Sequence, residues 1–339
     1  KTARGASAPV TGCGAVGSYY GAQLARAGHA VHFLLRSDYE AVRRQGVRIQ
    51  SPEGQFQVHP HCARRPEEIG PADLVLIGLK TTANGQFPAL LPPLVGPESA
   101  VLTLQNGLGN EEQLARLFPA AQILGGLCFV CLNRIAPGVI RHIGFGQVVL
   151  GEFQRPPAPR TRAIAARFAE AGVPCTVTDD LARTHWEKLV WNIPFNGLGV
   201  AGAAGPEVLH QLAGSEGSAE DALPPGSPPG GCLTTDILLA DARWSRLVRE
   251  LMREVIAAAR ALGHAVPDDF AGPLIERTRA MGAYKASTLI DFERGQPLEL
   301  QSLFQEPLRQ ALRAGVAVPR LAALCQVLER LADRQPAAG

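Results

Sequence analysis

The sequence predicts an α/β protein in which an N-terminal Rossmann-type domain, built on a parallel sheet, is followed by an all-α C-terminal domain. Two observations favour this class. Apolar, strand-like runs alternate with helical patterns up to about residue 179, as they do where helices connect parallel strands. Residues 180–332 then show helical patterns throughout. We therefore expect domains of residues 1–179 and 180–332, and a chain of 339 residues is long enough to bury both cores.

A glycine-rich turn near the N-terminus is the first candidate site. It has the form GxGxxG and is followed by a helical pattern at residues 18–27 and a strand-like run at residues 29–35. In such a turn the first glycine allows the tight bend, the second lets the backbone approach a pyrophosphate, and the third lets the helix pack close to the strand. The phosphates would sit at the helix N-terminus, where free N–H groups favour an anion, although a purely structural turn is the alternative. The candidate cofactor-binding residues are Gly12, Cys13, Gly14, Ala15, Val16 and Gly17.

The residues after the second strand indicate which dinucleotide binds. A site that prefers NAD usually places Asp or Glu there to bond the ribose 2′-hydroxyl. This chain has Arg36 followed by Ser37, and a guanidinium at that point suits a 2′-phosphate. The residues therefore favour NADP(H), against the alternative of a solvated arginine just beyond a strand.

Two later strands end in polar residues that could line the same site. The apolar runs at residues 72–79 and 100–104 are typical of parallel strands buried on both faces. They end at Lys80 and, within the stretch QNG, at Asn106. Since ligands of open α/β sheets bind at the carboxyl edge, we expect both residues near the dinucleotide.

The remaining elements of this half are less regular. Before the glycines only Pro9 and Val10 resemble a strand, so we expect a short or frayed first strand. A turn at residues 51–54 predicts a strand pair on either side of it. The other predicted elements are a helix at 39–45, strands at 47–50, 55–58, 123–130 and 139–152, a helix at 160–171 and a strand at 175–178.

Composition excludes several classes of protein. Lys and Arg total 33 against 31 Asp and Glu, so neither nucleic acid nor an anionic membrane surface is an expected partner. No apolar run approaches the roughly 20 residues of a membrane span, and the N-terminus lacks a signal-peptide layout. Seven scattered cysteines favour a reducing cytoplasm. We interpret Cys128 and Cys131 as parts of a buried strand and expect no metal site. The sequence does not determine the oligomeric state, so a homodimer stays open.

The lysines and one predicted helix point to the chemistry. Only four of the 33 basic residues are lysines, and a partly buried lysine can release a proton where arginine cannot. Lys188, Asn192 and Asn196 are spaced i, i+4, i+8 on a helix predicted over residues 181–199, so they share one face. Such a stripe would suit a cleft for a small polar substrate. The alternative is an exposed polar face.

The helical half contains one atypical segment. Residues 213–232 are rich in Gly, Pro, Ser and acidic residues, which predicts a disordered surface insertion. Residues 333–339 predict a loose tail. The further predicted helices cover residues 236–262, 269–281, 301–314 and 319–331.

A second polar cluster completes a family pattern. Ser287 and Asp291 share a helix face at i, i+4, and Glu299 follows. With these residues the chain resembles the ketopantoate reductase family over about residues 8–331. The matching motifs are GCGAVG with the later Arg36, LKT at 79–81, QNG at 105–107, K-x-x-x-N-x-x-x-N at 188–196, and S-x-x-x-D followed by Glu299.

The resemblance implies a reaction and a fold. Members of the family reduce 2-dehydropantoate to pantoate with NADPH, in the pantothenate pathway, and share the two-domain fold of the 6-phosphogluconate dehydrogenase group. By matching position, the glycine loop, Arg36 and Lys80 would hold the cofactor, and Asn106 would lie near the nicotinamide and the substrate.

The resemblance also implies roles in the helical half. Lys188 would give a proton to the ketone oxygen as hydride arrives at the carbon. Asn192, Asn196 and Ser287 would bind the substrate's hydroxyl and carboxylate. Glu299 would bind the cofactor ribose or position the lysine.

Two alternatives stay open. The insertion and the stretch after Glu299, which reads LQSLFQE, depart from the family pattern and leave another 2-oxo acid as a possible substrate. A non-catalytic NADP-binding sensor is the other alternative. The candidate catalytic residues Lys188, Asn106 and Glu299 count against the sensor.

Overall fold

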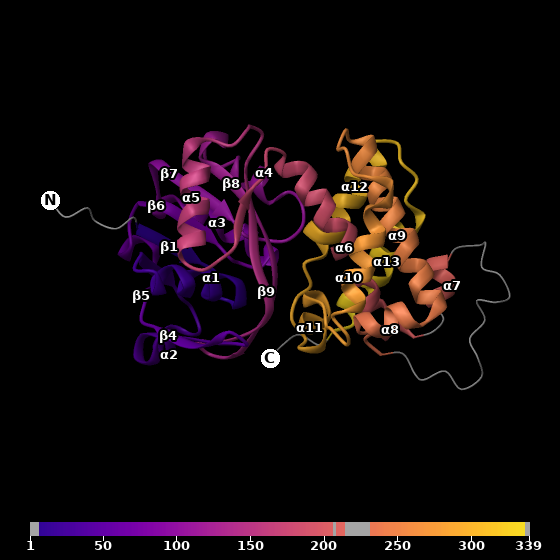
Figure 1. Ribbon diagram of the computed structural model, residues 1–339, viewed down its shortest axis with the longest axis horizontal. Helices are drawn as coiled ribbons and strands as arrows, with labels where there is room; N and C mark the ends of the chain where they lie inside the picture. The colour runs from indigo at the N-terminus through magenta and orange to yellow at the C-terminus, as the bar shows by residue number, and fades with distance from the viewer. Residues whose placement is uncertain (1–6, 206–207, 214–230, 336–339) are drawn as a thin grey trace. The chain divides into compact units, whose positions relative to one another are not determined.

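The described part of the chain comprises two compact units. The computed structural model describes residues 7–205, 208–213 and 231–335. The units are Lys1–Leu181 and Ala182–Gly339, so the division falls two residues after the predicted boundary (Figure 1). Among the described residues, no helix combines the length and the apolar character needed to cross a membrane.

The first unit is built on one ten-stranded sheet. The strand order is β4-β3-β9-β8-β7-β6-β1-β2-β5, and β10 pairs with β9. The strands are β1 (Ser7–Thr11), β2 (Ala30–Leu34), β3 (Val47–Ser51), β4 (Gly54–Val58), β5 (His61–Ala63), β6 (Ala72–Ile77), β7 (Val95–Thr103), β8 (Ile123–Ala136), β9 (Val139–Glu152) and β10 (Cys175–Val177).

The sheet is mixed, with a parallel Rossmann core. Strands β8, β7, β6, β1, β2 and β5 run parallel to their neighbours in that order. Two pairs are antiparallel, β8 with β9 and β3 with β4. The α/β class, the parallel core and the strand pair around residues 51–54 are therefore confirmed. The connection from β8 to β9 is too short for a crossover, so these two strands run antiparallel.

The first strand forms despite its poor sequence. β1 pairs with β2 over all five of its residues, and Val10 is fully buried. On its other side it pairs with β6 only through Val10 and Thr11. Pro9, which has no N–H to donate, sits directly before that short register. The strand is thus short, as expected, and its weak side is the one toward β6.

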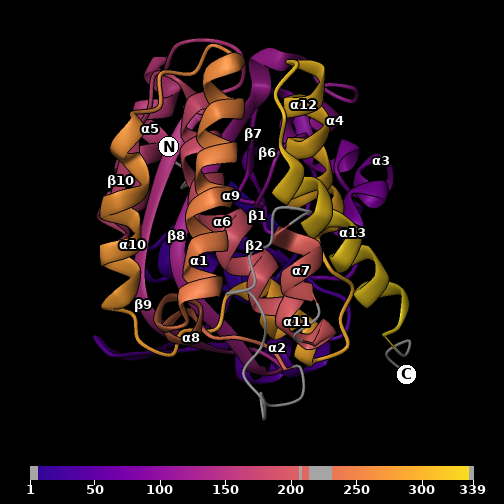
Figure 2. The ribbon, with the colours of Figure 1, turned by 90° about the vertical axis from the view of Figure 1, so that its right-hand side faces the viewer.

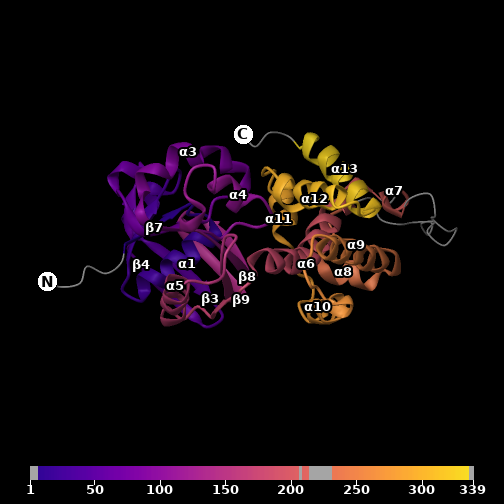
Figure 3. The same ribbon diagram turned by 90° about the horizontal axis from the view of Figure 1, so that it is seen from above.

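Helices cover both faces of the sheet. Helices α1 (Ala15–Arg26) and α5 (Pro159–Glu170) pack on one face, and α3 (Phe87–Leu90) and α4 (Asn110–Leu114) pack on the other (Figure 3). Successive residues of β6 alternate between the two cores, as the pleat requires: Leu76 joins the first and Ile77 the second. The remaining helices of this unit are α2 (Tyr39–Gln45) and the short 3-10 helices η1 (Pro66–Glu68), η2 (Thr81–Gln86), η3 (Pro92–Leu94) and η4 (Ala120–Gln122).

The second unit is helical throughout its described residues. Helix α9 (Ala242–Ala261) packs against both α12 (Glu306–Arg313) and α13 (Pro319–Asp333) (Figure 2). The helices are α6 (Leu181–Ala201), η5 (Gly202–Ala204), α7 (Val208–Ala213), α8 (Thr235–Ala240), α9 (Ala242–Ala261), η7 (Asp268–Phe270), α10 (Ala271–Arg279), α11 (Ser287–Glu293), η8 (Gln301–Gln305), α12 (Glu306–Arg313) and α13 (Pro319–Asp333).

Glycines let α6 pack closely inside this unit. A Cβ on Gly197 would lie 2.5 Å from Leu324 of α13 and 3.0 Å from Phe304 of η8. A Cβ on Gly202, just beyond α6, would lie 2.5 Å from Leu233. From Asn192 to its end the helix is buried all round, which is typical of a central helix.

Several predicted boundaries need correction. The helix expected over residues 236–262 is two helices, because the Asp241 carboxylate accepts hydrogen bonds from Arg243 N and Trp244 N and caps a new helix. The helix expected over residues 301–314 begins with a π-helical turn, η8.

The structure also corrects the edges of the two segments predicted to be loose, residues 213–232 and 333–339. Ala213 belongs to α7, and most of the predicted insertion, residues 214–230, lies outside the described residues. At the tail, α13 extends to Asp333 and the Gln335 side chain donates a hydrogen bond to Phe292 O at 2.9 Å. Residues 336–339 lie outside the described residues.

Candidate functional site

The glycine loop connects β1 to α1, and its three glycines meet different surroundings. Gly12 has φ +81°, and a Cβ there would lie 2.2 Å from Leu79 N. A Cβ on Gly17 would lie 2.4 Å from Gly12 O, so only glycine lets α1 pack this close to the loop. At Gly14 a Cβ would meet no described atom within 4 Å. The first and third glycines are therefore needed by the fold, whereas the second leaves open space beside the backbone.

The start of α1 is suited to an anion. Gly14 is its N-cap, no acidic residue lies in the first turn, and the helix has 12 residues. Ser18 Oγ donates its hydrogen bond back to Cys13 O at 2.9 Å. The N–H groups of the first turn have no partner within the helix, which favours a phosphate at this point. The open space at Gly14 and this helix N-terminus together fit the pyrophosphate of a dinucleotide.

The side chain of Cys13 turns away from that space into the protein. Its Sγ lies 3.4 Å from Val10 O and 3.6 Å from Leu34 O, at the ends of β1 and β2. Burial, followed by the nearby Cys62 and Asp38, raises the pKa of this thiol well above its usual value. Cys13 can therefore serve a dinucleotide only through its backbone.

Two charged residues follow β2, and only one is exposed. Arg36 is exposed, and no hydrogen bond or ion pair joins it to the described residues. Asp38 is 5% exposed, and its carboxylate accepts from Arg134 Nη1 at 2.7 and 2.8 Å and from Gly138 N at 3.3 Å. The acid beyond β2 is thus already committed to the fold, which leaves a guanidinium at the position that contacts the ribose of a bound dinucleotide.

Lys80 and Asn106 follow neighbouring strands at one edge of the sheet. β6 and β7 are parallel, and Ile77 at the end of one pairs with Thr103 at the end of the other. Lys80 is exposed and Asn106 is half-buried. The expectation that both stand beyond the carboxyl ends of adjacent parallel strands is confirmed.

A network of buried amides lies beneath these two residues and was not predicted. Gln105 Nε2 donates to Leu79 O at 3.0 Å and to Asn84 Oδ1 at 2.7 Å. Asn84 Nδ2 then donates to Asn110 Oδ1 at 3.0 Å. Gln105 stands in the recognised QNG stretch, but nothing in the sequence marks Asn84 or Asn110 as its partners.

The polar stripe on α6 is largely buried. Asn192 is 7% exposed and Asn196 2%, while Lys188 is half-buried. The alternative of an exposed polar face is therefore excluded for the two asparagines. Buried amides stay in a protein interior only when they have partners or a bound polar molecule.

Asn196 has a clear structural role. Its Oδ1 accepts a hydrogen bond from Thr288 N at 3.0 Å and from Ser287 Oγ at 3.3 Å, at the first turn of α11. Thr235 Oγ1 donates to Gly282 O at 2.7 Å and so anchors the loop before that helix. Thus Asn196 and Ser287, predicted from separate clusters, lie in contact.

Among the candidate site residues of this unit, Glu299 is the acidic residue that is buried. It is 5% exposed and directly precedes the turn that leads into the π-helix η8, where Ser302 is 4% exposed. π-helical turns are frequent at functional sites because they re-aim the side chains of an otherwise regular helix. Asp291, on α11, is half-buried.

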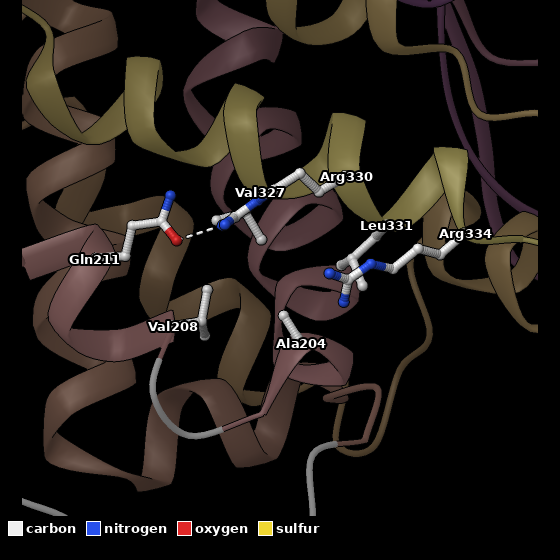
Figure 4. Close-up of a pocket in the computed structure, with 7 residues that line it drawn as sticks. All are labelled: Ala204, Val208, Gln211, Val327, Arg330, Leu331 and Arg334. Carbon is white, nitrogen blue, oxygen red and sulfur yellow. Dashed lines mark hydrogen bonds between the residues drawn. The ribbon is translucent and has the colours of Figure 1, made fainter.

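A hollow elsewhere in the helical unit contains none of the predicted site residues. It has a volume of about 170 Å³, and Arg330 on its rim donates a hydrogen bond to Gln211 (Figure 4). Its lining residues are Ala204, Val208, Gln211, Val327, Arg330, Leu331 and Arg334. The predicted substrate residues of this unit therefore do not line this hollow.

The fold and the site residues define a class of protein. A Rossmann-type dinucleotide-binding domain followed by a helical unit with a buried polar stripe is a two-domain, nicotinamide-dependent oxidoreductase. Family models described as ketopantoate reductase PanE/ApbA and its C-terminal domain match residues 9–155 and 230–332. The chain belongs to the ketopantoate reductase family, whose cofactor is NADP(H), and it is an oxidoreductase acting on a CH–OH group.

Relatives match along the whole length. A 2-dehydropantoate 2-reductase of Nostoc sp. is 38% identical over 335 residues, covering 96% of this chain and 95% of the relative. One of Halobacterium salinarum is 30% identical, covering 96% and 98%. The crystal structure of 2-dehydropantoate 2-reductase from Geobacter metallireducens has a TM-score of 0.85 at 45% identity and covers 96% of this chain and 99% of the other. These matches support ketopantoate reductase activity.

Proposed function

We propose that this protein reduces 2-dehydropantoate to pantoate with NADPH, as a step of pantothenate biosynthesis. The observation that carries the proposal is the half-buried Lys188 in line with the buried Asn192 and Asn196 on one helix. A cation with two amides suits a small substrate that has a carboxylate, a hydroxyl and a ketone. The similarity to 2-dehydropantoate 2-reductases over nearly the whole chain supports this substrate.

The cofactor choice rests on Arg36. A D-mandelate dehydrogenase whose structure contains NADH shares the fold with a TM-score of 0.78 at 17% identity, so the fold alone does not select between NADH and NADPH. Here the carboxylate after β2 is held by Arg134, and Arg36 is exposed. An exposed guanidinium favours the 2′-phosphate that only NADPH carries. The loop N–H groups would hold the pyrophosphate, and Lys80 and Asn106 would lie toward the nicotinamide end.

The chemistry divides between proton transfer and orientation. When bound, NADPH supplies the hydride that reduces the ketone carbon. Lys188 Nζ donates a proton to the ketone oxygen, where negative charge develops. Asn192 and Ser287 orient the substrate's hydroxyl and carboxylate, and Asn196 holds Ser287 in place. Glu299 orients Lys188 or binds the cofactor ribose.

The experiment that tests the proposal measures NADPH consumption with 2-dehydropantoate and with a panel of other 2-oxo acids. We expect turnover with 2-dehydropantoate and a decrease in kcat of about 10²–10⁴-fold in Lys188→Ala. Lys285→Ala is the matched control, because that lysine is paired with Glu293 at 2.7 Å on the surface and should leave kcat unchanged.

Two other outcomes would change the proposed substrate or refute the proposed reaction. Turnover with a different 2-oxo acid only would keep the mechanism and change the substrate, which the shared fold of D-mandelate dehydrogenase permits. Tight NADPH binding without turnover on any 2-oxo acid would favour the sensor. We also place the protein in a reducing compartment such as the cytoplasm, because all seven cysteines are free thiols.

A further inference from the structure

The buried side chains of Gln105, Asn84 and Asn110 form a continuous series of hydrogen bonds at the edge of the sheet, here called the amide chain. At one end Gln105 Nε2 donates to Leu79 O, the carbonyl directly before Lys80. At the other end Asn110 Nδ2 donates to Asn106 O at 3.1 Å. Asn84 connects the two, since it accepts from Gln105 and donates to Asn110. The chain thus joins the backbone after β6 to the backbone after β7.

Burial and hydrogen bonding fix the orientation of every amide in this chain. Gln105 is 5%, Asn84 8% and Asn110 0% exposed. Thr103 Oγ1 donates to Gln105 Oε1 at 3.0 Å, which leaves the Gln105 nitrogen directed at the two acceptors. A buried amide that is flipped, or replaced by a carboxylate, would set acceptor against acceptor, at a cost comparable to a lost hydrogen bond for each contact.

We propose that Gln105, Asn84 and Asn110 are positioning residues that hold Lys80 and Asn106 at a set separation for the nicotinamide cofactor. The proposal rests on the function proposed above and extends it, because none of the three side chains needs to touch cofactor or substrate. Lys80 and Asn106 stand on irregular backbone beyond the strands, where hydrogen bonds between β6 and β7 no longer fix their spacing. The hydrogen bonds of the amide chain fix the spacing at that point instead.

The test compares two buried glutamines that both donate through Nε2 to oxygen acceptors: Gln105, which follows the end of β7, and Gln122, which binds its first half. In Gln105→Glu, an acceptor replaces the nitrogen that binds Leu79 O. The control is Gln122→Glu, since Gln122 is 8% exposed and its Nε2 donates to Gly96 O, Pro97 O and Ser99 O near the start of β7. Both variants should lose a similar amount of Tm. Only Gln105→Glu should raise the Kd for NADPH and lower kcat/KM, by about 10- to 100-fold.

A milder variant separates the two ends of the chain. Asn110→Asp keeps the oxygen that accepts from Asn84 but loses the donor to Asn106 O. We expect kcat to fall about 10-fold or more with a smaller change in the Kd for NADPH, because the displaced residue is Asn106 rather than Lys80. This variant also replaces Gln105→Glu if the latter does not fold.

The outcomes distinguish this proposal from the function on which it rests. Equal Kd and kcat/KM values in Gln105→Glu and Gln122→Glu would overturn the positioning role, as would wild-type kinetics in Asn110→Asp. If the wild-type protein binds NADPH but does not reduce 2-dehydropantoate, the proposed function fails. The Kd comparison would then still decide whether the amide chain positions the cofactor site.

Discussion

Arg36 and Asp38 stand two residues apart beyond the same strand, yet their surroundings differ. Asp38 is buried and bound by Arg134, whereas Arg36 is exposed. The sequence alone suggested NADP(H) from the residue at position 36. It could not show that the nearby acid is unavailable, because Arg134 lies 96 positions further along the chain.

We predict that Arg36→Ala changes cofactor preference rather than cofactor binding in general. Loss of a charged hydrogen bond to the 2′-phosphate should raise the Kd for NADPH about 10- to 100-fold. The Kd for NADH should stay near its wild-type value. Both constants can be measured by fluorescence titration, with Arg65→Ala, an exposed arginine paired with Glu68, as the control. A parallel loss of affinity for both dinucleotides would contradict the assignment.

Hydrophobic periodicity predicted the helices and strands, but it did not predict the residues at which they begin, end or are capped. The helix at Tyr39–Gln45 stands where the pattern placed it, and the strand predicted at 123–130 extends to Ala136 and so includes Cys131. The break at Asp241 was missed because an aspartate inside a helical pattern is ordinarily a solvated side chain. The cap on α11 was missed because its acceptor, Asn196, comes from another helix.

Because Asn196 caps α11, we predict that different substitutions at this residue affect stability and activity separately. Asn196→Ala removes the acceptor from Thr288 N and should cost about 1–3 kcal/mol of unfolding free energy. Asn196→Asp keeps an acceptor at a helix N-terminus and should retain most of that free energy. If the Asn196 amide nitrogen binds the substrate, the Asp variant should still lose kcat/KM. Urea unfolding and steady-state kinetics measure the two effects, and equal instability of both variants would contradict the capping role.

At the level of the whole molecule, a buried carboxylate of the first unit holds the end of a strand to the helix that follows it. The residue is Glu152, at the end of β9, and its side chain is fully shielded from solvent. It accepts from Arg160 Nη2 at 2.7 Å and from Arg155 Nη2 at 2.8 Å, and Thr161 Oγ1 also donates to it. Burial alone would raise the pKa of this carboxyl, but the hydrogen bonds from Arg160, Thr161 and Arg155 lower it overall.

This lowered pKa predicts how stability depends on pH. Because the folded pKa lies below the ordinary value of 4.5, the stabilisation is complete above about pH 4.5 and is lost as the pH falls through the folded pKa. Glu152→Gln should cost about 1–3 kcal/mol near neutral pH, and its difference from the wild type should shrink in acid. Urea unfolding across pH measures this difference. Glu40→Gln, which alters an exposed ion pair, is the control, and a pH-independent difference for Glu152→Gln would contradict the prediction.

The position of Cys13 within the glycine loop has a consequence for how this thiol reacts. Cys13 stands directly before Gly14, beside the proposed pyrophosphate position, and its sulfur lies close to Val10 O and Leu34 O with a raised pKa. Because the raised pKa keeps the thiolate fraction small and Cys13 is half-buried, a thiol reagent should react with it slowly. A dinucleotide bound over the loop should slow that alkylation further. The alkylation rate of Cys13 would thus report whether the proposed cofactor position is occupied.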